Sequence, residues 1–218
     1  MKISQKSNYF RNYIKREILM ENLEKKTVQG VKTQLHIMNV ALDLFKSLGY
    51  EKVSVDRIVK ESGTSKGSFY QHFPSKSSIF MMRFMEMDEH YVYIYEEVKE
   101  KYSSAVERLE AFYLAVFRCI EKELGKDLMR VIYSAAIISN EHTFFTNEKR
   151  KLYVILRQII EEGKRDNSIQ NISSTNDFFQ TIIQSMMGAI YFWGLQLDDS
   201  SLEDMGKPLI KHLVTGLH

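Results

Sequence analysis

The stretch from Val53 to Lys76, VSVDRIVKESGTSKGSFYQHFPSK, constrains the fold of this chain more than any other segment. Ser54 can cap a short helix whose apolar residues recur at helical spacing, and Gly63 suits the left-handed residue that ends it. Two residues later, Ser65 can cap a second helix. Two short helices joined by a turn of about 3–4 residues that contains glycine form a helix-turn-helix, whose second helix enters the major groove of DNA.

The second of these helices has two different faces. Phe69 and Phe73 are four residues apart, so they share one side of the helix and can bury against the first helix. The opposite side is polar around Gly67, whose missing side chain allows a close approach of the backbone to DNA. Pro74 ends the helix because proline has no amide proton. Lys76 begins the next helix, where its ammonium and a backbone N–H can bind one phosphate together.

This stretch resembles the DNA-binding signature of TetR-family transcriptional regulators. The matching residues are Ser54, Ile58, Gly63, Ser65, Gly67, Ser68, Phe69, Tyr70, Phe73 and Lys76. Serine replaces the more usual threonine at two of these positions, which keeps the hydroxyl, and many fixed positions within about two dozen residues make the match specific. The resemblance implies an all-α fold of about nine helices, in which a three-helix helix-turn-helix domain precedes a larger helical domain for ligand binding and dimerisation.

Charge is divided unevenly along the chain. Residues 1–76 hold 14 Lys and Arg against 7 Asp and Glu, a net charge of +7, whereas residues 77–218 hold 16 against 21, a net charge of −5. A basic N-terminal third attracts phosphates, and an acidic remainder repels DNA. We therefore expect a basic N-terminal extension over 1–29, a DNA-binding domain over 30–76 and a sensing and dimerisation domain over 77–218. The extension is either a basic arm along DNA or a partly helical, solvated leader, and Met20 is an alternative start of translation.

A third helix completes the expected DNA-binding domain. From about Val31 to Leu48 the apolar residues follow one amphipathic stripe, and Gly49 ends the helix. We expect Lys66 and Ser68 to contact base edges and the other polar residues to contact phosphates of double-stranded operator DNA or lie beside them. The residues expected at DNA are Lys32, Thr33, Ser54, Thr64, Ser65, Lys66, Gly67, Ser68, Tyr70, Gln71, His72 and Lys76.

Residues 77–218 show the apolar spacing of further helices. We expect them over 78–102, 105–124, 126–139, 147–164, 175–197 and 201–217. The helix over 126–139 is apolar nearly all round, which predicts burial on every side. The helix over 175–197 carries more apolar surface than one core needs, so we expect it and the last helix to form a homodimer interface, as in the resembled family. The expected interface residues are Phe179, Ile183, Met187, Leu209 and Leu213.

The resemblance also implies a small-molecule effector inside the second domain. Its aromatic residues either line an apolar cavity with a few polar groups or form solid core, which is the more common role of aromatic stripes at helical spacing. The candidates are Phe112, Tyr113, Phe117, Tyr133, Phe178 and Trp193. Few Lys or Arg lie along the apolar stripes, which favours an uncharged or amphipathic effector over a polyanion.

Patterns typical of enzymes and metal sites are absent from the sequence. It contains no HExxH, paired-cysteine, G-x-S-x-G or P-loop motif, and no His has a Glu three residues before it. We therefore expect no catalytic residue, metal ligand or cofactor. The single Cys119 excludes an internal disulfide, there is no secretory signal at the start, and no apolar run reaches about 18 residues, so we expect a cytoplasmic protein without a membrane segment.

Two functions remain open from the sequence. The first is a homodimeric, TetR-like regulator, most often a repressor, that an effector releases from a palindromic operator. The second is a helical homodimeric interaction protein or enzyme that retains the fold without operator binding. Strongly salt-dependent binding to a specific duplex distinguishes the first from the second.

Overall fold

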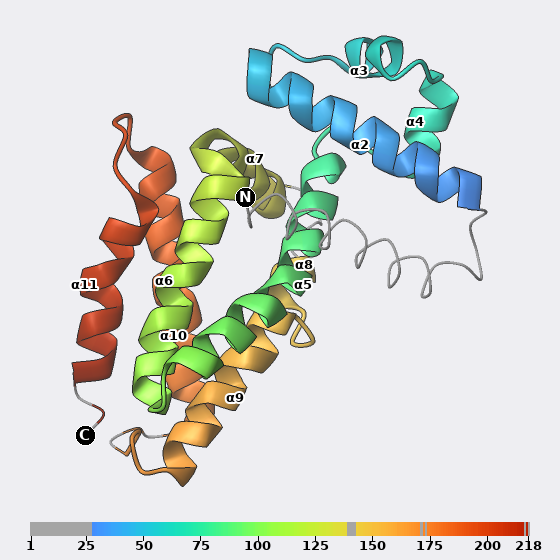
Figure 1. The fold of residues 1–218 in the computed structure, drawn as a ribbon. Coiled ribbons are helices and arrows are strands. Elements are labelled where there is room, and N and C mark those ends of the chain that lie inside the picture. The colour runs from blue at the N-terminus through green and yellow to red at the C-terminus, as the bar shows by residue number, and fades with distance from the viewer. Residues whose placement is uncertain (1–27, 139–142, 171, 173, 216, 218) are drawn as a thin grey trace. The chain divides into compact units, whose positions relative to one another are not determined.

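The computed structural model describes residues 28–138, 143–170, 172, 174–215 and 217, whose regular structure is entirely helical (Figure 1). The helices are α2 (Val28–Leu48), α3 (Val55–Glu61), α4 (Lys66–His72), α5 (Ser78–Lys101), α6 (Ala105–Glu123), α7 (Gly125–Ile138), α8 (Thr143–Thr146), α9 (Lys151–Arg165), α10 (Thr175–Leu195) and α11 (Leu202–Thr215). The expected all-α class is confirmed. Most of the expected extension over 1–29 lies outside the described residues, and its last two residues begin α2.

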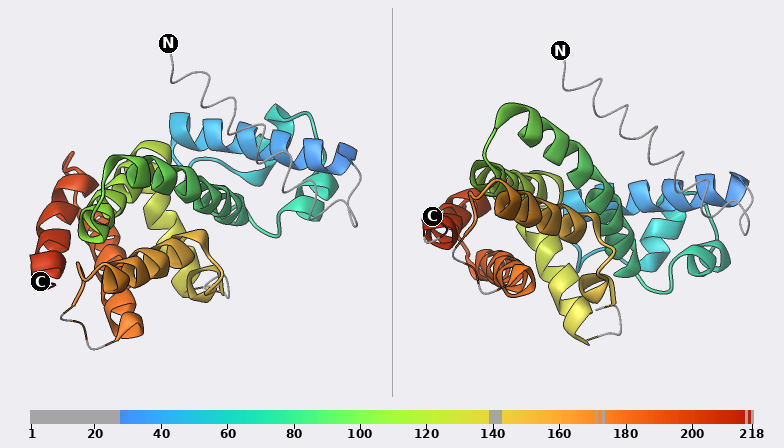
Figure 2. Two further views of the ribbon diagram at one scale, coloured as in Figure 1. Left: turned by 60° about the horizontal axis from the view of Figure 1, so that its bottom comes forward. Right: turned by 90° about the horizontal axis from the view of Figure 1, so that it is seen from below.

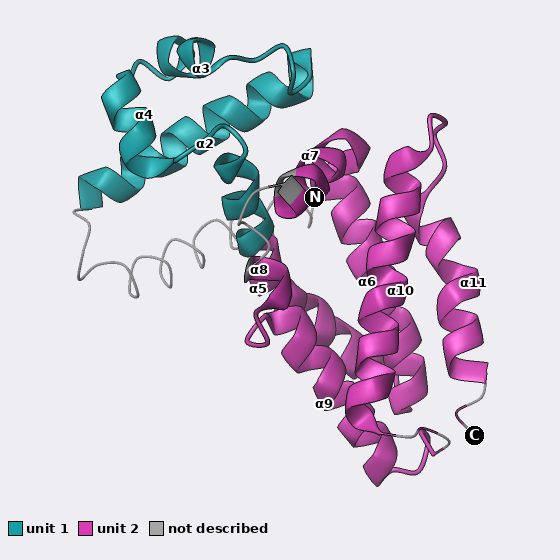
Figure 3. Cartoon of the chain, turned by 180° about the vertical axis from the view of Figure 1, so that it is seen from behind, with its two compact units in different colours: residues 1–86 teal, residues 87–218 magenta. Residues whose placement is uncertain are grey.

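Two compact units make up the chain, residues 1–86 and residues 87–218 (Figure 3). The sequence placed the division before α5, whereas this division falls inside α5. The first unit reaches into α5 because Phe80 packs on Phe45 and Tyr50, with ring centroids 4.7 and 5.0 Å apart. One helix therefore belongs to both units.

The first unit is built from α2, α3, α4 and the start of α5. Helix α4 packs against both α2 and α3 and lies beside the N-terminal half of α2 (Figures 1 and 2). The buried apolar side chains of this unit come from all three helices and from the residue that follows α4: Ile37, Ala41, Ile58, Phe69 and Phe73. Glycines at positive φ end α2 and α3, at +83° for Gly49 and +62° for Gly63, because other residues rarely adopt this conformation.

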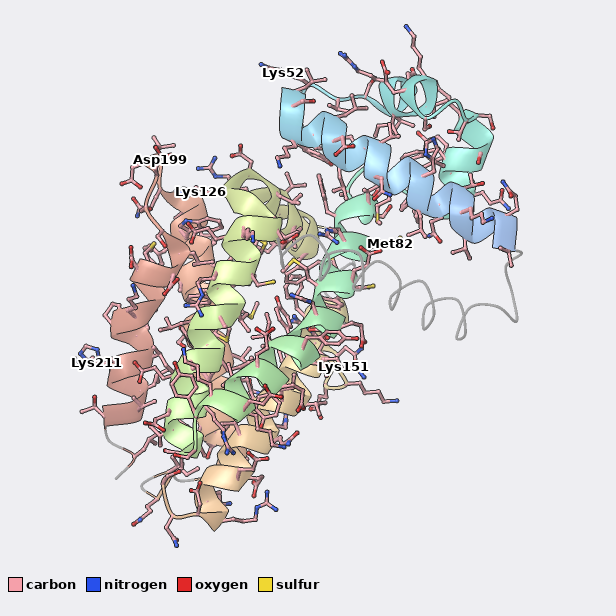
Figure 4. The ribbon with its side chains drawn as sticks, viewed as in Figure 1. Lys52, Met82, Lys126, Lys151, Asp199 and Lys211 are labelled. Atoms are coloured by element: carbon pink, nitrogen blue, oxygen red, sulfur yellow. The ribbon has the colours of Figure 1, made fainter. Side chains whose placement is uncertain are left out.

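In the second unit, α6 and α10 each pack against α7, α9 and α11. Tyr113 and Phe117 on α6 lie under α11 at Gly206, where a Cβ atom would overlap the Phe117 ring. Helix α5 lies against α9, and the Tyr95 hydroxyl of α5 donates to Glu162 Oε2 at 3.0 Å. Where α7 begins, Lys126 Nζ donates to the Asp198 carbonyl oxygen at 2.6 Å; Figure 4 labels Lys126 and the neighbouring Asp199 at this end of the unit. No helix of the described part of the chain is long and apolar enough to cross a membrane.

Two expectations about the second unit were wrong. Helix α7 is not buried on every side, since Ile137 is 77% exposed and the exposed Arg130 extends from it to the Gly194 and Gln196 carbonyl oxygens. Helix α9 begins at Lys151 rather than near residue 147. The cause is a turn in which Asn147 Oδ1 accepts from Lys149 N at 3.0 Å, because asparagine side chains favour turns over helix interiors.

Candidate nucleic-acid interface and candidate effector site

Two serine caps set the start of each helix in the helix-turn-helix. Ser54 is extended, and its Oγ accepts from Arg57 N at 3.2 Å. Ser65 has the same conformation, and its Oγ accepts from Ser68 N at 3.1 Å. Such caps contribute about 0.5–2 kcal/mol each, which matters for helices as short as α3 and α4. The structure confirms both caps.

Helix α4 buries one face and exposes the other. Phe69 and Phe73 are 0% and 1% exposed, whereas Tyr70 is 54% exposed. The other exposed residues on or next to α4 are Ser65, Lys66, Gly67 and Gln71, and Ser68 and His72 are half-buried. The aromatic pair therefore fixes α4 to its unit and leaves the polar face of the helix exposed to solvent.

Lys66 has a partner that the sequence interpretation missed. Its Nζ lies 2.6 Å from Asp56 Oδ1 at the start of α3, and both side chains are about two-thirds exposed, at 62% and 67%. The hydrogen bond that Lys66 donates to Asp56 raises the pKa of Lys66. An acidic residue in the first turn of a helix is favourable by itself, so nothing in the sequence pattern associates Asp56 with Lys66. The ion pair orients Lys66 on the proposed DNA surface.

The turn between α3 and α4 is held by side chains. Thr64 Oγ1 shares a 2.8 Å hydrogen bond with Ser62 Oγ, and His36 Nε2 on α2 donates to the Ser62 carbonyl oxygen at 3.0 Å. The hydroxyl of Thr64, expected at DNA, thus already binds within the turn. In the first turns of α2, Lys32 is exposed and Thr33 Oγ1 donates to the Gln29 carbonyl oxygen at 2.9 Å.

Lys76 occupies a different environment from the expected one. Its Nζ donates to the carbonyl oxygens of Tyr50 at 2.8 Å and Val53 at 2.9 Å, and it lies 3.7 Å from the centre of the Tyr50 ring. Burial lowers the pKa of Lys76. The ammonium therefore joins the segment between α2 and α3 to the segment between α4 and α5. This arrangement requires a revision of the phosphate role expected for Lys76.

The proposed DNA surface carries a modest positive charge. Residues 28–76 hold 7 Lys and Arg against 4 Asp and Glu, a net charge of +3. The rest of the basic surplus of residues 1–76 lies in residues 1–27, outside the described part. Among the described residues, no group of three or more His, Cys, Asp or Glu is placed to hold a metal ion.

The residues expected at a dimer interface fall into two groups. Phe179 and Ile183 are 2% and 6% exposed inside their own subunit, and Arg157 covers the Phe179 ring at 3.9 Å. Leu209 is 38% exposed, and Met187 and Leu213 are half-buried. The expectation for Phe179 and Ile183 therefore needs revision. Large apolar side chains that α10 does expose are Tyr191, Phe192 and Leu195.

The six aromatic residues expected around an effector do not share one location. Tyr113 packs on Phe117 with centroids 4.6 Å apart and shares a 3.2 Å hydrogen bond with Ser185, and burial raises the pKa of Tyr113 to about 12. Trp193 Nε1 donates to the Ser200 carbonyl oxygen at 2.8 Å. Phe112 packs on Tyr95 of α5. Phe178 is 9% exposed on α10. These contacts are those of core packing.

Tyr133 lies at a polar centre that the sequence interpretation missed. Its ring packs on Phe145 with centroids 5.9 Å apart, and its hydroxyl donates to the Met187 carbonyl oxygen at 3.3 Å. The Phe145 ring is also one of three aromatic rings around the Arg150 guanidinium, with those of Phe144 and Tyr153. Tyr133 is thus the one expected effector residue that borders a buried charge.

The buried charge pair connects α5 to the start of α9. Arg150 Nε donates to Asp88 Oδ1 at 3.2 Å, with side chains only 4% and 7% exposed. Asp88 Oδ2 also accepts from Lys151 N at 2.6 Å; Figure 4 labels Lys151 at this helix start. The Asp88 carboxylate therefore caps α9 from a neighbouring helix, where the helix dipole favours a negative charge. No spacing in the sequence relates Asp88 to a helix start more than sixty residues away, at Lys151.

Comparison with known proteins supports the identity of the first unit. Residues 37–81 match the family described as "Bacterial regulatory proteins, tetR family". Over 159 residues the chain is 25% identical to an HTH-type transcriptional regulator of Staphylococcus aureus (strain bovine RF122 / ET3-1), covering 69% of this chain and 83% of that protein. The chain is also 39% identical over 59 residues to the HTH-type transcriptional regulator AcrR of Shigella flexneri, covering 27% of each.

Solved structures share the fold of most of the chain. Bacillus subtilis FadR in complex with stearoyl-CoA has a TM-score of 0.67 at 20% identity, covering 84% of this chain and 99% of that one. Thermus thermophilus FadR in complex with lauroyl-CoA has a TM-score of 0.66 at 17% identity, covering 85% of this chain and 95% of that one. At these identities the similarity shows a common fold.

Proposed function

Since this chain is a transcriptional regulator of the TetR family, we propose that it is a homodimeric repressor whose α4 reads a palindromic operator. The observation that carries the proposal is the form of the helix-turn-helix. Two short serine-capped helices bury Phe69 and Phe73 and leave the polar face of α4 exposed, on a unit with a net positive charge. Such a face fits the major groove, where side chains reach base edges.

The polar residues divide into two roles in this proposal. Lys66 and Ser68 contact base edges, and Asp56 holds Lys66 in place before DNA binds. Lys32, Thr33, Ser54, Ser65, Tyr70, Gln71 and His72 contact phosphates or lie beside them, and Gly67 keeps the backbone of α4 close to DNA. Thr64 and Lys76 support the interface through their contacts to Ser62 and to the Tyr50 and Val53 carbonyls.

The dimer places two copies of α4 on one face of the DNA. We assign its interface to the exposed apolar side chains Tyr191, Phe192 and Leu195 of α10 and Leu209 of α11, with Met187 and Leu213 beside them. Gly188 supports this assignment, because a Cβ atom there would meet nothing within 4 Å and a partner helix can approach closely. Two α4 helices about 34–36 Å apart match half-sites one helical turn of DNA apart.

An amphipathic effector with a long apolar chain is the ligand class that we propose. Two proteins with this fold are bound to stearoyl-CoA and lauroyl-CoA in their solved structures, and this similarity supports an acyl ligand for the second unit. The effector releases the operator only if it binds the DNA-free conformation more tightly than the DNA-bound one. A regulator that must reach chromosomal DNA acts in the cytoplasm.

A gel shift of the full-length protein against its own upstream DNA tests the proposal at near-physiological salt. We expect a discrete complex that resists unrelated duplex, with affinity that falls steeply as salt rises. Lys66→Ala should relax sequence preference, whereas Lys32→Ala should weaken binding to all DNA alike and reduce the salt slope by about one. Only smeared, fully competed binding to this and to genome-wide fragments would instead support a helical interaction protein or enzyme that retains the fold.

A further inference from the structure

Tyr91 of α5 carries a buried hydroxyl with unmet hydrogen-bonding capacity. The residue is 1% exposed, and within the described part of the chain its hydroxyl has no hydrogen-bond partner. Buried hydroxyls are almost always hydrogen-bonded, because burial removes their bonds to water. The missing partner of Tyr91 therefore lies outside the described residues, and a water molecule or a ligand can supply it.

The surroundings of Tyr91 are polar but electrically balanced. The groups near enough to act on its phenol are Cys119 of α6, Tyr133 of α7, Asp88 of α5 and Arg150 before α9. Asp88 and Arg150 are bound to each other, and the Tyr133 hydroxyl donates to Met187. Burial raises the pKa of Tyr91 well above its usual value, so the phenol stays protonated and can donate a hydrogen bond.

We propose that the Tyr91 hydroxyl donates a hydrogen bond to the carbonyl oxygen of an acyl thioester, ester or amide bound inside the second unit. This inference rests on the proposed effector class and adds the group that orients it. A neutral carbonyl suits this position better than a free carboxylate, because the positive charge of Arg150 is already balanced by Asp88 and a second buried anion would be left without a counter-charge. Tyr91 thus distinguishes acyl derivatives from both alkanes and free fatty acids.

A matched pair of probes isolates this hydrogen bond. Lauroyl-CoA has the thioester carbonyl, whereas S-dodecyl-CoA is a thioether with the same chain length and headgroup and no carbonyl. By calorimetric titration we expect the wild-type protein to bind lauroyl-CoA about five- to tenfold more tightly, the value of one buried hydrogen bond. Tyr91→Phe should abolish this preference by weakening lauroyl-CoA alone.

Tyr95→Phe is the control variant on the same helix. Tyr95 lies one turn after Tyr91 and is also buried, but its hydroxyl donates to Glu162 at 3.0 Å. The Tyr95→Phe variant should change the binding of lauroyl-CoA and S-dodecyl-CoA by the same factor. The inference is overturned if Tyr91→Phe affects both probes equally or neither. If neither probe binds a wild-type protein that still retards its operator in the gel, the inference fails and the proposed regulator stands. If the wild-type protein prefers lauroyl-CoA but binds no operator, the inference stands and the proposed regulator fails.

The ligand-free protein gives a second, independent readout. Because the Tyr91 hydroxyl has no partner in the described chain, Tyr91→Phe should leave the melting temperature unchanged or raise it. Tyr95→Phe should lower the melting temperature, because it removes the bond to Glu162. A lower melting temperature for Tyr91→Phe would show that the hydroxyl holds a structural water and would overturn the assignment of a ligand.

Discussion

Replacing Lys76 with methionine separates a structural role from a phosphate-binding role. Lys76 Nζ donates to the Tyr50 and Val53 carbonyl oxygens at 2.8 and 2.9 Å and lies over the Tyr50 ring. Methionine keeps most of the apolar stem and removes only the charge and the donors. The variant therefore tests the ammonium and not the packing of the side chain.

The geometry gives the size of the expected effect. Hydrogen bonds to a charged group contribute about 1.5–3 kcal/mol, and a cation over an aromatic ring contributes about 0.5–1 kcal/mol at an exposed site. Desolvation, which lowers the pKa of Lys76, opposes part of this gain. We expect Lys76→Met to reduce the free energy of unfolding by about 2–3 kcal/mol.

Urea denaturation followed by circular dichroism measures this change on the full-length protein. Lys52→Met is the control: Lys52 is exposed in the same unit and is labelled in Figure 4, and its replacement should change stability by less than about 0.5 kcal/mol. Operator affinity should be measured across a range of salt concentrations on the same samples. Unchanged stability together with a salt slope reduced by about one would show that Lys76 binds a phosphate and would refute the structural role.

Three further variants test other parts of the structure. Gly206→Ala should destabilise the protein by about 1–3 kcal/mol in a urea titration, because the added Cβ would overlap the Phe117 ring, and an unchanged midpoint would contradict that packing. Glu86→Gln should raise stability near neutral pH and not near pH 4, because burial raises the pKa of Glu86 despite Arg83. Above the ordinary glutamate pKa the native state therefore binds more protons than the unfolded state, and the stability of the wild-type protein falls as pH rises through the raised pKa. The same stability gain at both pH values would argue against this cause. Leu195→Arg should give monomers in sedimentation velocity if α10 forms the dimer interface, and a dimer that persists would place the interface elsewhere.

Features that depend on neighbouring residues were predictable from the sequence. The caps at Ser54 and Ser65 and the left-handed Gly63 require only a few consecutive residues. The burial of Phe69 and Phe73 follows from helical spacing. Because these features depend on nearby residues, the helix-turn-helix was the part of the fold that could be predicted most completely from the sequence.

Features that depend on distant contacts were not predictable in this way. A lysine at the start of a helix suggests a phosphate ligand. The contacts of Lys76 Nζ with the Tyr50 and Val53 carbonyl oxygens become visible only in the folded chain. The surplus apolar surface expected for the helix over 175–197 indicated an interface but not which of its apolar residues face the core. The structure buries Phe179 and Ile183 and exposes Tyr191 and Leu195, which moves the proposed interface toward the C-terminal end of the helix.

The position of Tyr91 on α5 sets a limit on how strongly its hydrogen bond can control DNA binding. Helix α5 belongs to both compact units, so a ligand held by Tyr91 acts directly on a helix that continues into the DNA-binding unit. By linkage, the hydrogen bond changes operator affinity only by the factor by which it differs between the DNA-bound and DNA-free conformations. A bond that forms in only one of them contributes at most its full five- to tenfold effect, about 1–1.4 kcal/mol, and a bond that forms in both contributes nothing. Since a shift from almost fully bound to almost fully released operator requires about 5.5 kcal/mol, most of the regulatory energy must come from burial of the acyl chain, with Tyr91 selecting which acyl derivative is bound.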